Sequence, residues 1–461
     1  MKKRIFLSMA LVASLMSGCY ENYQDETPGN NPIVPPTLED VRDVDREETI
    51  SLYGTNFPSI VITVNFADVQ MTTAEDEIIN KIYGKQFGEL NNYFQKSSEY
   101  NFYLEPIAEN DSNQNGLINI TLPYNHIGSS GSVSDQQYKN LIVDIMEEAL
   151  PYLDLNSLDK NNNNIIEQNE LTTIIMIAGY EESYDARNVP NVWAHSYGIT
   201  DATGTAYLEY GDYTIGSWYG LFGELHGNHS ATIGIIAHEL SHAILELPDL
   251  YNTDPSNPSL GIGPYGIMGS GAWGTTTING VSEPGNTPME YSAFSKLASG
   301  FVIPKTVIQG TDYKEYTLNS NNTNKYEMLK IEVTDKEYFL VENISNTGYN
   351  EGLNSQIVNH IGGIAIWHID TQLYADLYDS NTVNNDPNHK AVDIEEASTL
   401  NLDKGVDPIS TDLYYTGNKT IFNENTSTSN SRLYNGSISG FNLTNVSSLG
   451  KTMSVTLKNK I

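Results

Sequence analysis

Cysteine is almost absent from this chain of 461 residues, which contains only Cys19. A single cysteine excludes an intrachain disulfide, and it excludes zinc sites built from two or four cysteine ligands. It also excludes a latency switch in which a cysteine from the body of the protein covers a catalytic metal. A metal site in the folded part would have to use other ligands.

Basic residues are scarce too, because 24 Lys and Arg stand against 58 Asp and Glu, for a formal net charge of −34. Nucleic-acid binders need the opposite sign, since their affinity comes from neutralising phosphates. We therefore expect no nucleic-acid partner. An acidic surface instead attracts cations such as Ca²⁺, and it also favours solubility outside the cytoplasm.

Long apolar runs are missing after the N-terminus, so no transmembrane helix is expected in the body of the chain. The apolar stretch Ile5–Met16 is too short to span a bilayer. It follows the basic residues Lys2–Arg4, and two small residues separate it from Cys19. This pattern indicates a bacterial lipoprotein signal, residues 1–18, with Met16 at the usual leucine position and Cys19 as the acylated residue. Ordinary secretion by the same signal is the alternative.

Residues 19–52 are rich in Pro, Asn, Asp and Glu. Such a composition is typical of a flexible tether, here one that holds the folded part away from a membrane. A short pro-segment is the alternative. Together with the lipid, the tether predicts an extracytoplasmic lipoprotein of the cell envelope, at the outer membrane or cell surface.

Order begins after the tether, with strands and helices in alternation. The β-branched runs 60–65 and 171–178 and the shorter 101–106 read as strands, whereas 73–98 and 136–152 have helical patterns. Alternation of this kind predicts an α/β (α+β) catalytic domain over residues 53–308. From residue 309 the pattern changes to strands separated by Asn- and Ser-rich connectors, which predicts a mostly β domain over 309–461. Its expected strands are 313–318, 326–333, 338–344, 364–369 and 453–458.

The segment 230–249, SATIGIIAHELSHAILELPD, predicts a buried helix with one polar stripe. His238 and His242 are one turn apart on the same face, so their imidazoles can reach one Zn²⁺ at about 2.0–2.1 Å. Glu239 projects beside them and can take a proton from an attacking water and pass it to a leaving amine. Two core histidines beside a glutamate are the alternative, but burying all three without a metal would be costly.

A catalytic zinc needs a third protein ligand and an open position. Asp249, just after Pro248, is the nearest candidate, and Glu246 is a rival one turn beyond His242. A distant Glu, such as Glu283 or Glu290, would define a different subclass of enzyme.

Several segments resemble the immune inhibitor A family of secreted bacterial metallopeptidases, which is grouped with the metzincins. The most specific are HELSHAILELPDLYNTD, which begins at His238, and GIGPYGIMGSGAW (261–273). Others are 91–106, 191–199, 288–301, 337–353 and 362–370, so the resemblance runs from about residue 55 to the C-terminus. It implies a metzincin-like catalytic fold and peptidase activity.

The resemblance also implies roles for single residues. His238 and His242 would bind zinc, Glu239 would be the general base and Asp249 the third ligand. Met268 matches the methionine of the metzincin Met-turn, an apolar floor below the metal. The chain departs from the family, which more often has Gly shortly after the second His and Asp one residue earlier. Here Leu245 stands near that Gly position, and the spacing from His242 to Asp249 is one residue longer than in the family.

A second metal site is predicted by residues 159–170, DKNNNNIIEQNE, which fit a twelve-residue loop like that of EF-hands. Asn164 takes the usual glycine position, and asparagine tolerates the left-handed conformation needed there. A polar Asn-rich turn is the alternative. The predicted Ca²⁺ ligands are Asp159, Asn161, Asn163, the carbonyl of Ile165, Glu167 and Glu170.

These features predict a monomeric zinc endopeptidase that acts on protein or peptide substrates. The alternative from a different class is an inactive envelope lipoprotein that binds a protein or glycan partner, and a zinc hydrolase acting on another bond is a third hypothesis. Four histidines outside the motif are assigned lesser roles. We expect a surface loop for His226 and His229, with a place lining the site as the alternative, and structural roles for His195 and His368.

Overall fold

The computed structural model describes residues 56–459 apart from 111–112, 131, 200–207, 309, 311, 322 and 324. The predicted signal peptide, its Cys19 and the tether 19–52 lie outside the described residues. Within the described part of the chain, no helix has both the length and the apolar character needed to cross a membrane.

The chain forms two compact units. One contains the described part of Ile50–Leu247 together with Glu283–Asn286, and the other contains Pro248–Ser282 and the described part of Thr287–Ile461. This division falls between Leu247 and Pro248, inside the segment 53–308 that we assign to the catalytic domain. The predicted domain boundary at residue 308 stays a prediction.

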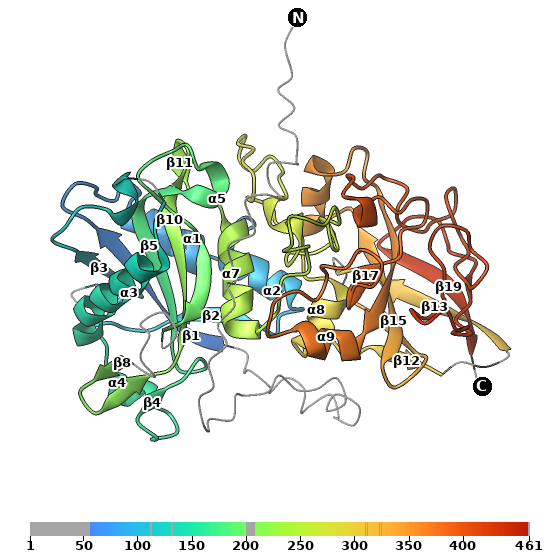
Figure 1. The fold of residues 1–461 in the computed structure, drawn as a ribbon, viewed down its shortest axis with the longest axis horizontal. Helices are drawn as coiled ribbons and strands as arrows, with labels where there is room; N and C mark the ends of the chain where they lie inside the picture. The colour runs from blue at the N-terminus through green and yellow to red at the C-terminus, as the bar shows by residue number, and fades with distance from the viewer. Residues whose placement is uncertain are drawn as a thin grey trace, which may run out of the picture. The chain divides into compact units, whose positions relative to one another are not determined.

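The first unit is built on a mainly parallel sheet with strand order β11-β10-β5-β1-β2, to which β3, β6 and β7 add (Figure 1). The long β-branched runs of β1 and β5 are buried on both faces, as parallel strands usually are. The strands are β1 (Asn56–Asn65), β2 (Tyr103–Pro106), β3 (Leu117–Thr121), β5 (Thr172–Glu181), β6 (Asn191–Val192), β7 (His195–Gly198), β10 (Trp218–His226) and β11 (His229–Ser230).

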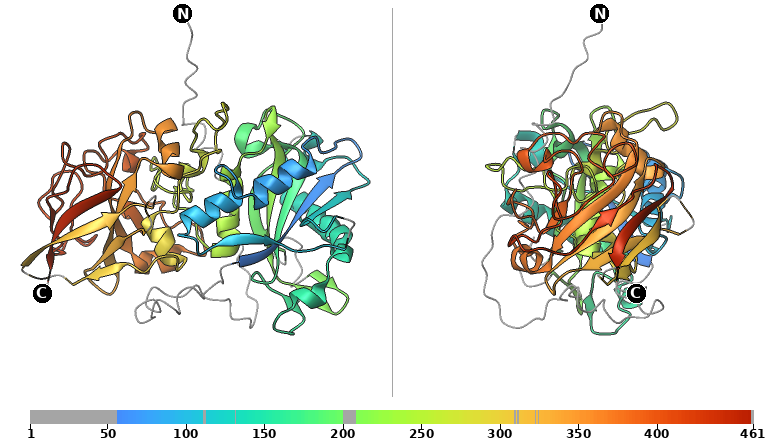
Figure 2. Two further views of the ribbon diagram at one scale, coloured as in Figure 1. Left: turned by 180° about the vertical axis from the view of Figure 1, so that it is seen from behind. Right: turned by 90° about the vertical axis from the view of Figure 1, so that its right-hand side faces the viewer.

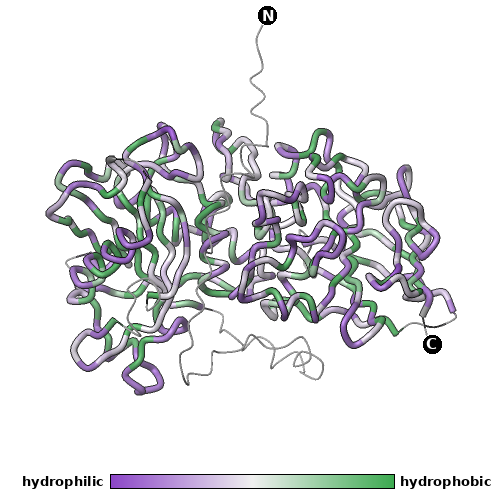
Figure 3. Tube along the Cα trace, viewed as in Figure 1, coloured by the Kyte–Doolittle hydropathy of each residue, from purple (hydrophilic) through white to green (hydrophobic). Residues whose placement is uncertain are grey.

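Helices cover both faces of this sheet. Alternate residues of β1, among them Ile60 and Ile62, share a core with Ile142 and Ile145 of α3 (Asp135–Ala149). Seen from behind, the opposite face carries α1 (Glu75–Tyr83) and α2 (Leu90–Ser97) (Figure 2). The helix α7 (Ile233–Leu245) contacts β10, β7 and α2. Hydropathy follows this plan, with apolar stretches along the central strands (Figure 3).

Smaller elements complete the first unit. Strand β4 (Ile165–Ile166) pairs with β9 (Tyr213–Ile215), and β9 pairs with β8 (Leu208–Tyr210). The short helices are η4 (Ile127–Ser130), η5 (Leu150–Tyr152), α4 (Leu155–Leu158) and α5 (Glu182–Asp185).

The second unit is rich in β-structure, as predicted for the C-terminal region. One sheet has the order β12-β14-β15-β16-β17 and another has the order β13-β19-β18. The strands are β12 (Lys305–Val307), β13 (Asp312–Asn319), β14 (Met328–Glu332), β15 (Glu337–Ser345), β16 (Gly362–Asp370), β17 (Val392–Ile394), β18 (Leu443–Thr444) and β19 (Thr452–Asn459). Its helices are η6 (Ser270–Trp273), α8 (Ala293–Ala298), η7 (Gly348–Ser355), α9 (Thr371–Leu377) and η8 (Leu402–Lys404).

The mixed helix and strand content confirms the predicted fold class. One predicted element differs from the structure, and several strands were not predicted. The single helix expected over 73–98 is two helices, because α1 ends at its C-cap Gly84 and Gly88 has φ 92°, a conformation that breaks a helix. Strand β10 was not predicted, because Gly220 and Gly223 interrupt its apolar pattern.

Candidate metal centre

The helix α7 begins and ends where its sequence predicts, within a few residues. Thr232 is its N-cap, and the Thr232 hydroxyl donates to the carbonyl of Pro284 at 2.7 Å instead of capping the helix. Twelve of its thirteen residues are buried, as expected from the apolar sequence around the motif. At the C-terminal end Glu246 adopts a left-handed conformation, with φ 52°. That turn allows the chain to leave the helix before Pro248.

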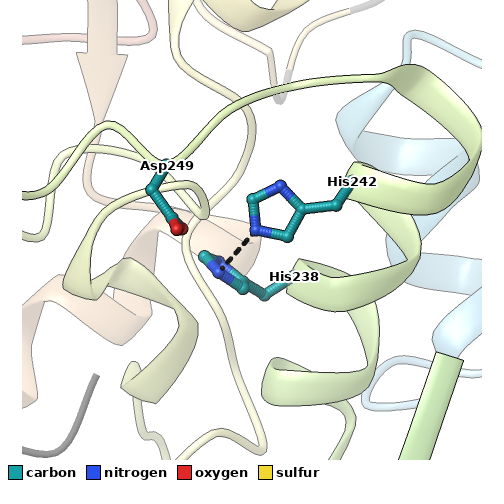
Figure 4. A group of neighbouring side chains, drawn as sticks. All are labelled: His238, His242 and Asp249. Atoms are coloured by element: carbon teal, nitrogen blue, oxygen red, sulfur yellow. Dashed lines mark hydrogen bonds between the residues drawn. The ribbon is translucent and has the colours of Figure 1, made fainter. Parts of the chain in front are cut away.

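His238, His242 and Asp249 come together after this turn (Figure 4). One ligand atom from each lies within 4.8 Å of the other two. The Nε2 atoms of the two histidines are 3.2 Å apart, which matches the separation of about 3.3 Å between two ligands of a tetrahedral zinc. Two imidazoles and a carboxylate also form a donor set that zinc accepts. The residues present therefore fit a metal ion of this kind.

The tautomer of His242 suits a metal ligand. Its Nδ1 lies within hydrogen-bond distance of the Leu247 carbonyl, which can only accept, so Nδ1 carries the proton. In the neutral ring Nε2 then presents a lone pair, and it is Nε2 that faces His238. A hydrogen bond of this type at the far nitrogen fixes the orientation of metal-binding histidines.

Glu239 lies on the same helix and is 2% exposed. The Ser196 hydroxyl, from β7, donates to Glu239 Oε2 at 3.2 Å. Strand β7 pairs antiparallel with β10, which places Ser196 opposite Gly220 in the register. The carboxylate thus has a hydrogen-bonding partner from the sheet.

The alternative third ligands do not belong to this group. Glu246, whose pKa burial raises, occupies the left-handed turn. Glu283 forms an ion pair with His229 at 2.9 Å, and Glu290 forms one with Lys296 at 3.4 Å. Of the carboxylates that the sequence offers as third ligand, all within the described residues, Asp249 is the one that lies beside the two histidines.

Residues 186–302 match the immune inhibitor A peptidase M6 catalytic domain. The M6 domain is that of a metallopeptidase family, so the match supports a peptidase that uses a metal. It contains both histidines, Glu239, Asp249 and Met268, and it confirms the family resemblance over these residues. The search of curated proteins found no match for this chain.

Met268, also in the M6 domain, is fully buried. Its carbonyl accepts from the backbone N–H of Leu250 at 2.8 Å, one residue after the third candidate ligand. The segment that resembles a Met-turn is therefore bonded directly to the chain that carries Asp249. The role of its side chain as a floor below a metal stays a prediction.

In the loop predicted to bind calcium, carboxylates accept hydrogen bonds from backbone N–H groups of the same loop. Asp159 Oδ1 and Oδ2 accept from the N–H groups of Asn163 and Asn164, at 3.1 and 2.9 Å. Glu170 Oε1 accepts from the N–H of Lys160 at 2.7 Å. Both carboxylates are buried, and Asn164 has φ 61°, the left-handed conformation expected at the sixth position. The backbone therefore follows the turn that a twelve-residue loop requires.

The expectation of a surface loop was wrong for His226, whereas His229 lies in the two-residue strand β11 and is partly exposed. His226 ends β10 and is completely buried, with its ring stacked on Tyr184 at 4.5 Å. Burial holds the pKa of His226 well below its ordinary value. Gly227 and Asn228 form a polar hairpin turn, and its polarity gives no sign that the preceding His226 is buried.

His195 and His368 make the structural contacts that we expected. His195 lies between the Trp193 carbonyl, 2.8 Å from Nδ1, and the Tyr219 hydroxyl, 3.0 Å from Nε2. His368 lies between Glu337 and Glu395, at 3.0 and 3.3 Å. Burial opposes its charged form, but hydrogen bonds to the two glutamates outweigh burial and raise the pKa of His368 to about 9.

Two residues near the site escaped the sequence analysis. Ser196 is adjacent to a histidine that we judged structural, and no sequence pattern links it to Glu239. Asn381 lies outside the M6 match, yet its amide forms hydrogen bonds with both the backbone and the carboxylate of Asp249. The sequence signal nearest to it is the density of asparagines in residues 381–388, a composition that is also typical of a connector.

Proposed function

We propose that this protein is a zinc-dependent endopeptidase that hydrolyses protein substrates outside the cytoplasm. The observation that carries the proposal is the convergence of His238, His242 and Asp249 beside the buried Glu239. The M6 match supports the peptidase part of the proposal, and the donor set supports zinc.

Zinc held by these three residues would supply a Lewis acid that polarises the scissile carbonyl and makes water a better nucleophile. Glu239 accepts the proton of the attacking water and then donates it to the leaving amine. Ser196 keeps Oε2 of Glu239 oriented while the proton is held. A buried carboxylate suits this exchange because its surroundings do not supply competing water.

Strand β7 favours an extended polypeptide as the substrate. Among the described strands its sole partner is β10, and it lies against α7. An extended peptide can add to such an edge through main-chain hydrogen bonds, whatever its side chains are. Neither end of the peptide needs to be recognised, which favours an endopeptidase over an exopeptidase.

The experiment that tests this proposal compares full-length protein, purified in detergent, with its Glu239→Gln variant. We expect one zinc per chain in both proteins, and casein hydrolysis in the wild type alone. Treatment with a chelator should abolish hydrolysis, and added zinc should restore it. Zinc without hydrolysis of any protein substrate would favour a hydrolase of another bond. A chain without zinc or hydrolysis would favour the inactive binding lipoprotein.

Attachment to the cell envelope is a further part of the proposal. It rests on the signal pattern that ends at Cys19. We expect Cys19→Ser to move the protein from the membrane fraction to the soluble extracytoplasmic fraction, because a polypeptide without the acyl chains has no anchor. Retention of the variant in the membrane would contradict lipidation at this residue. We also expect a monomer that acts on proteins, with no nucleic-acid partner.

Calcium is proposed as a structural ion in the loop 159–170. The support is the spacing of its oxygen ligands and the left-handed turn at Asn164. We expect millimolar Ca²⁺ to raise the unfolding temperature, since an ion that binds only the folded state stabilises it by mass action. Glu170→Gln should remove most of this effect, whereas Glu167→Gln, at a position that often binds through water, should remove less.

A further inference from the structure

We infer that Asn381 is the positioning residue that orients Asp249 as the third metal ligand. This inference rests on the proposed zinc function and adds to it a residue from the C-terminal β-rich part of the chain. The residue is 132 positions away from Asp249 in sequence and lies beyond the M6 match.

The side-chain amide of Asn381 forms two hydrogen bonds with Asp249. Its Oδ1 accepts from the backbone N–H of Asp249 at 2.8 Å, and its Nδ2 donates to Asp249 Oδ2 at 2.7 Å. Only one orientation of an amide can accept at one atom and donate at the other, so the two bonds define each other. Asp249 is fully buried and Asn381 is 5% exposed. Water therefore competes little for either bond.

Two bonds to one residue restrict its side chain strongly. The bond to the N–H holds the backbone at Asp249, and the bond to Oδ2 then fixes the plane of the carboxylate. A neutral donor does this without cancelling the negative charge of Asp249, which remains available to a cation. Groups of this kind behind a metal ligand set its orientation and contribute to affinity.

Asparagine also suits the backbone at position 381. Asn381 has φ 51°, in the left-handed region, and its N–H donates to the Tyr378 carbonyl just after α9. Asparagine adopts this conformation more readily than most residues with a side chain. Aspartate would tolerate the backbone as well, but it would lack the donor and would place a second negative charge against Asp249.

Neighbouring asparagines hold the rest of the segment in place. Asn384 Nδ2 donates to the Leu250 carbonyl at 2.8 Å. Asn385 Oδ1 accepts from the N–H and the hydroxyl of Thr253, at 2.8 and 3.1 Å. These bonds end on residues that follow Asp249 and do not touch its carboxylate. Asn385 is therefore a matched control for Asn381, with two side-chain bonds in the same segment but none to the ligand.

The test measures zinc affinity, by chelator competition, on full-length protein in detergent. Asn381→Gly keeps the positive φ and removes the amide, and Asn381→Asp keeps the side-chain shape and removes the donor. We expect both to lower zinc affinity by about 10- to 100-fold. They should also shift the visible spectrum of the cobalt-substituted protein, which reports ligand geometry. Asn385→Ala should change neither quantity, even if it lowers the unfolding temperature as much.

The outcomes separate this inference from the proposed function. Wild-type protein that binds zinc, with Asn381→Gly and Asn381→Asp equal to wild type in affinity and cobalt spectrum, overturns the inference alone. The same holds if Asn385→Ala lowers affinity as much as Asn381→Gly, since the effect would then belong to the segment. Wild-type protein that binds no zinc overturns the proposed function and this inference together.

Discussion

The two histidines and the aspartate of the candidate centre are held by different means. His238 and His242 lie on a helix, where a spacing of four residues places them on one face by geometry alone. Asp249 lies on irregular chain, and its carboxylate is oriented by an amide 132 residues further along the chain. Local structure determines the first pair, whereas tertiary contacts determine the third ligand.

This difference separates robust parts of the site from vulnerable ones. The histidines depend on α7, which is buried along almost its whole length and contacts β10 and β7. The aspartate depends on a turn at Glu246, on the segment of Met268 and on Asn381. Substitutions should therefore fall into two classes. Some remove a group that would bind the metal or transfer a proton, and others remove a contact that positions such a group.

The largest effect is expected from Glu239→Gln, which removes chemistry from the rigid helix. A general base contributes about 10²- to 10⁴-fold to a rate, so kcat should fall by about a thousandfold. Zinc content and unfolding temperature should stay near those of the wild type, because an amide fills the same space. Measurements of kcat and of zinc stoichiometry on the same samples test this prediction. A variant that loses its zinc would show that Glu239 contributes to metal binding instead of proton transfer.

Asp249→Ala should have the next largest effect and sharpen the contrast with the helix. Removing the third ligand should lower zinc affinity by more than the 10- to 100-fold typical of a supporting residue. The two histidines alone should still bind zinc weakly, because the helix keeps them together. Chelator competition measures the affinity. Binding equal to that of the wild type would return Glu246 or a distant glutamate to consideration as the ligand.

A third prediction concerns the stability of the compact unit that contains both Asp249 and Asn381. The pKa of His368 is raised to about 9, so its charge stabilises the fold fully below pH 6.5, and this contribution is lost as pH rises through 9. The loss is on the order of 3 kcal/mol. His368→Gln should lower stability at pH 6.5 and flatten the decline between pH 7.5 and 9.5. Thermal unfolding across that range tests it, and an unchanged slope would assign the decline to other groups.

The smallest effect is expected at the turn that joins the helix to Asp249. Glu246 has φ 52°, which is unfavourable for a residue with a Cβ and natural for glycine. Glu246→Gly should stabilise the protein by about 0.5–1 kcal/mol. Leu245→Gly, one residue earlier, should destabilise it by several kcal/mol, at about the cost of emptying a buried leucine site. Thermal unfolding of both variants locates the turn, and the reverse order would place it at Leu245.

Sequence reasoning succeeded where local patterns decide structure. The buried strands β1 and β5, the helices α3 and α7, and the β-rich C-terminal region are all present close to their expected bounds. It failed where tertiary contacts determine whether a segment forms a strand. In β10 the two glycines are tolerated because neighbouring strands pair with it. The helical stretch 73–98 failed for another reason, since glycines break it without any change in polarity.

The candidate site divides in the same way. The spacing of His238, Glu239 and His242 identifies them directly, and Asp249 follows from its closeness in sequence. No local pattern points to Ser196 or Asn381, because each acts across the fold on a residue at least 43 positions away. A hydrogen bond between residues far apart in sequence cannot be predicted from one sequence unless the residues belong to a known motif.

The distance between Asp249 and Asn381 also bears on how the protein is made. A growing chain contains both histidines and Asp249 long before the 132 further residues that lead to Asn381 have been synthesised. Until that segment folds back, the carboxylate has no amide to set its plane. The proposed metal centre would thus gain the amide that orients its third ligand late in synthesis, once the segment that contains Asn381 has been made.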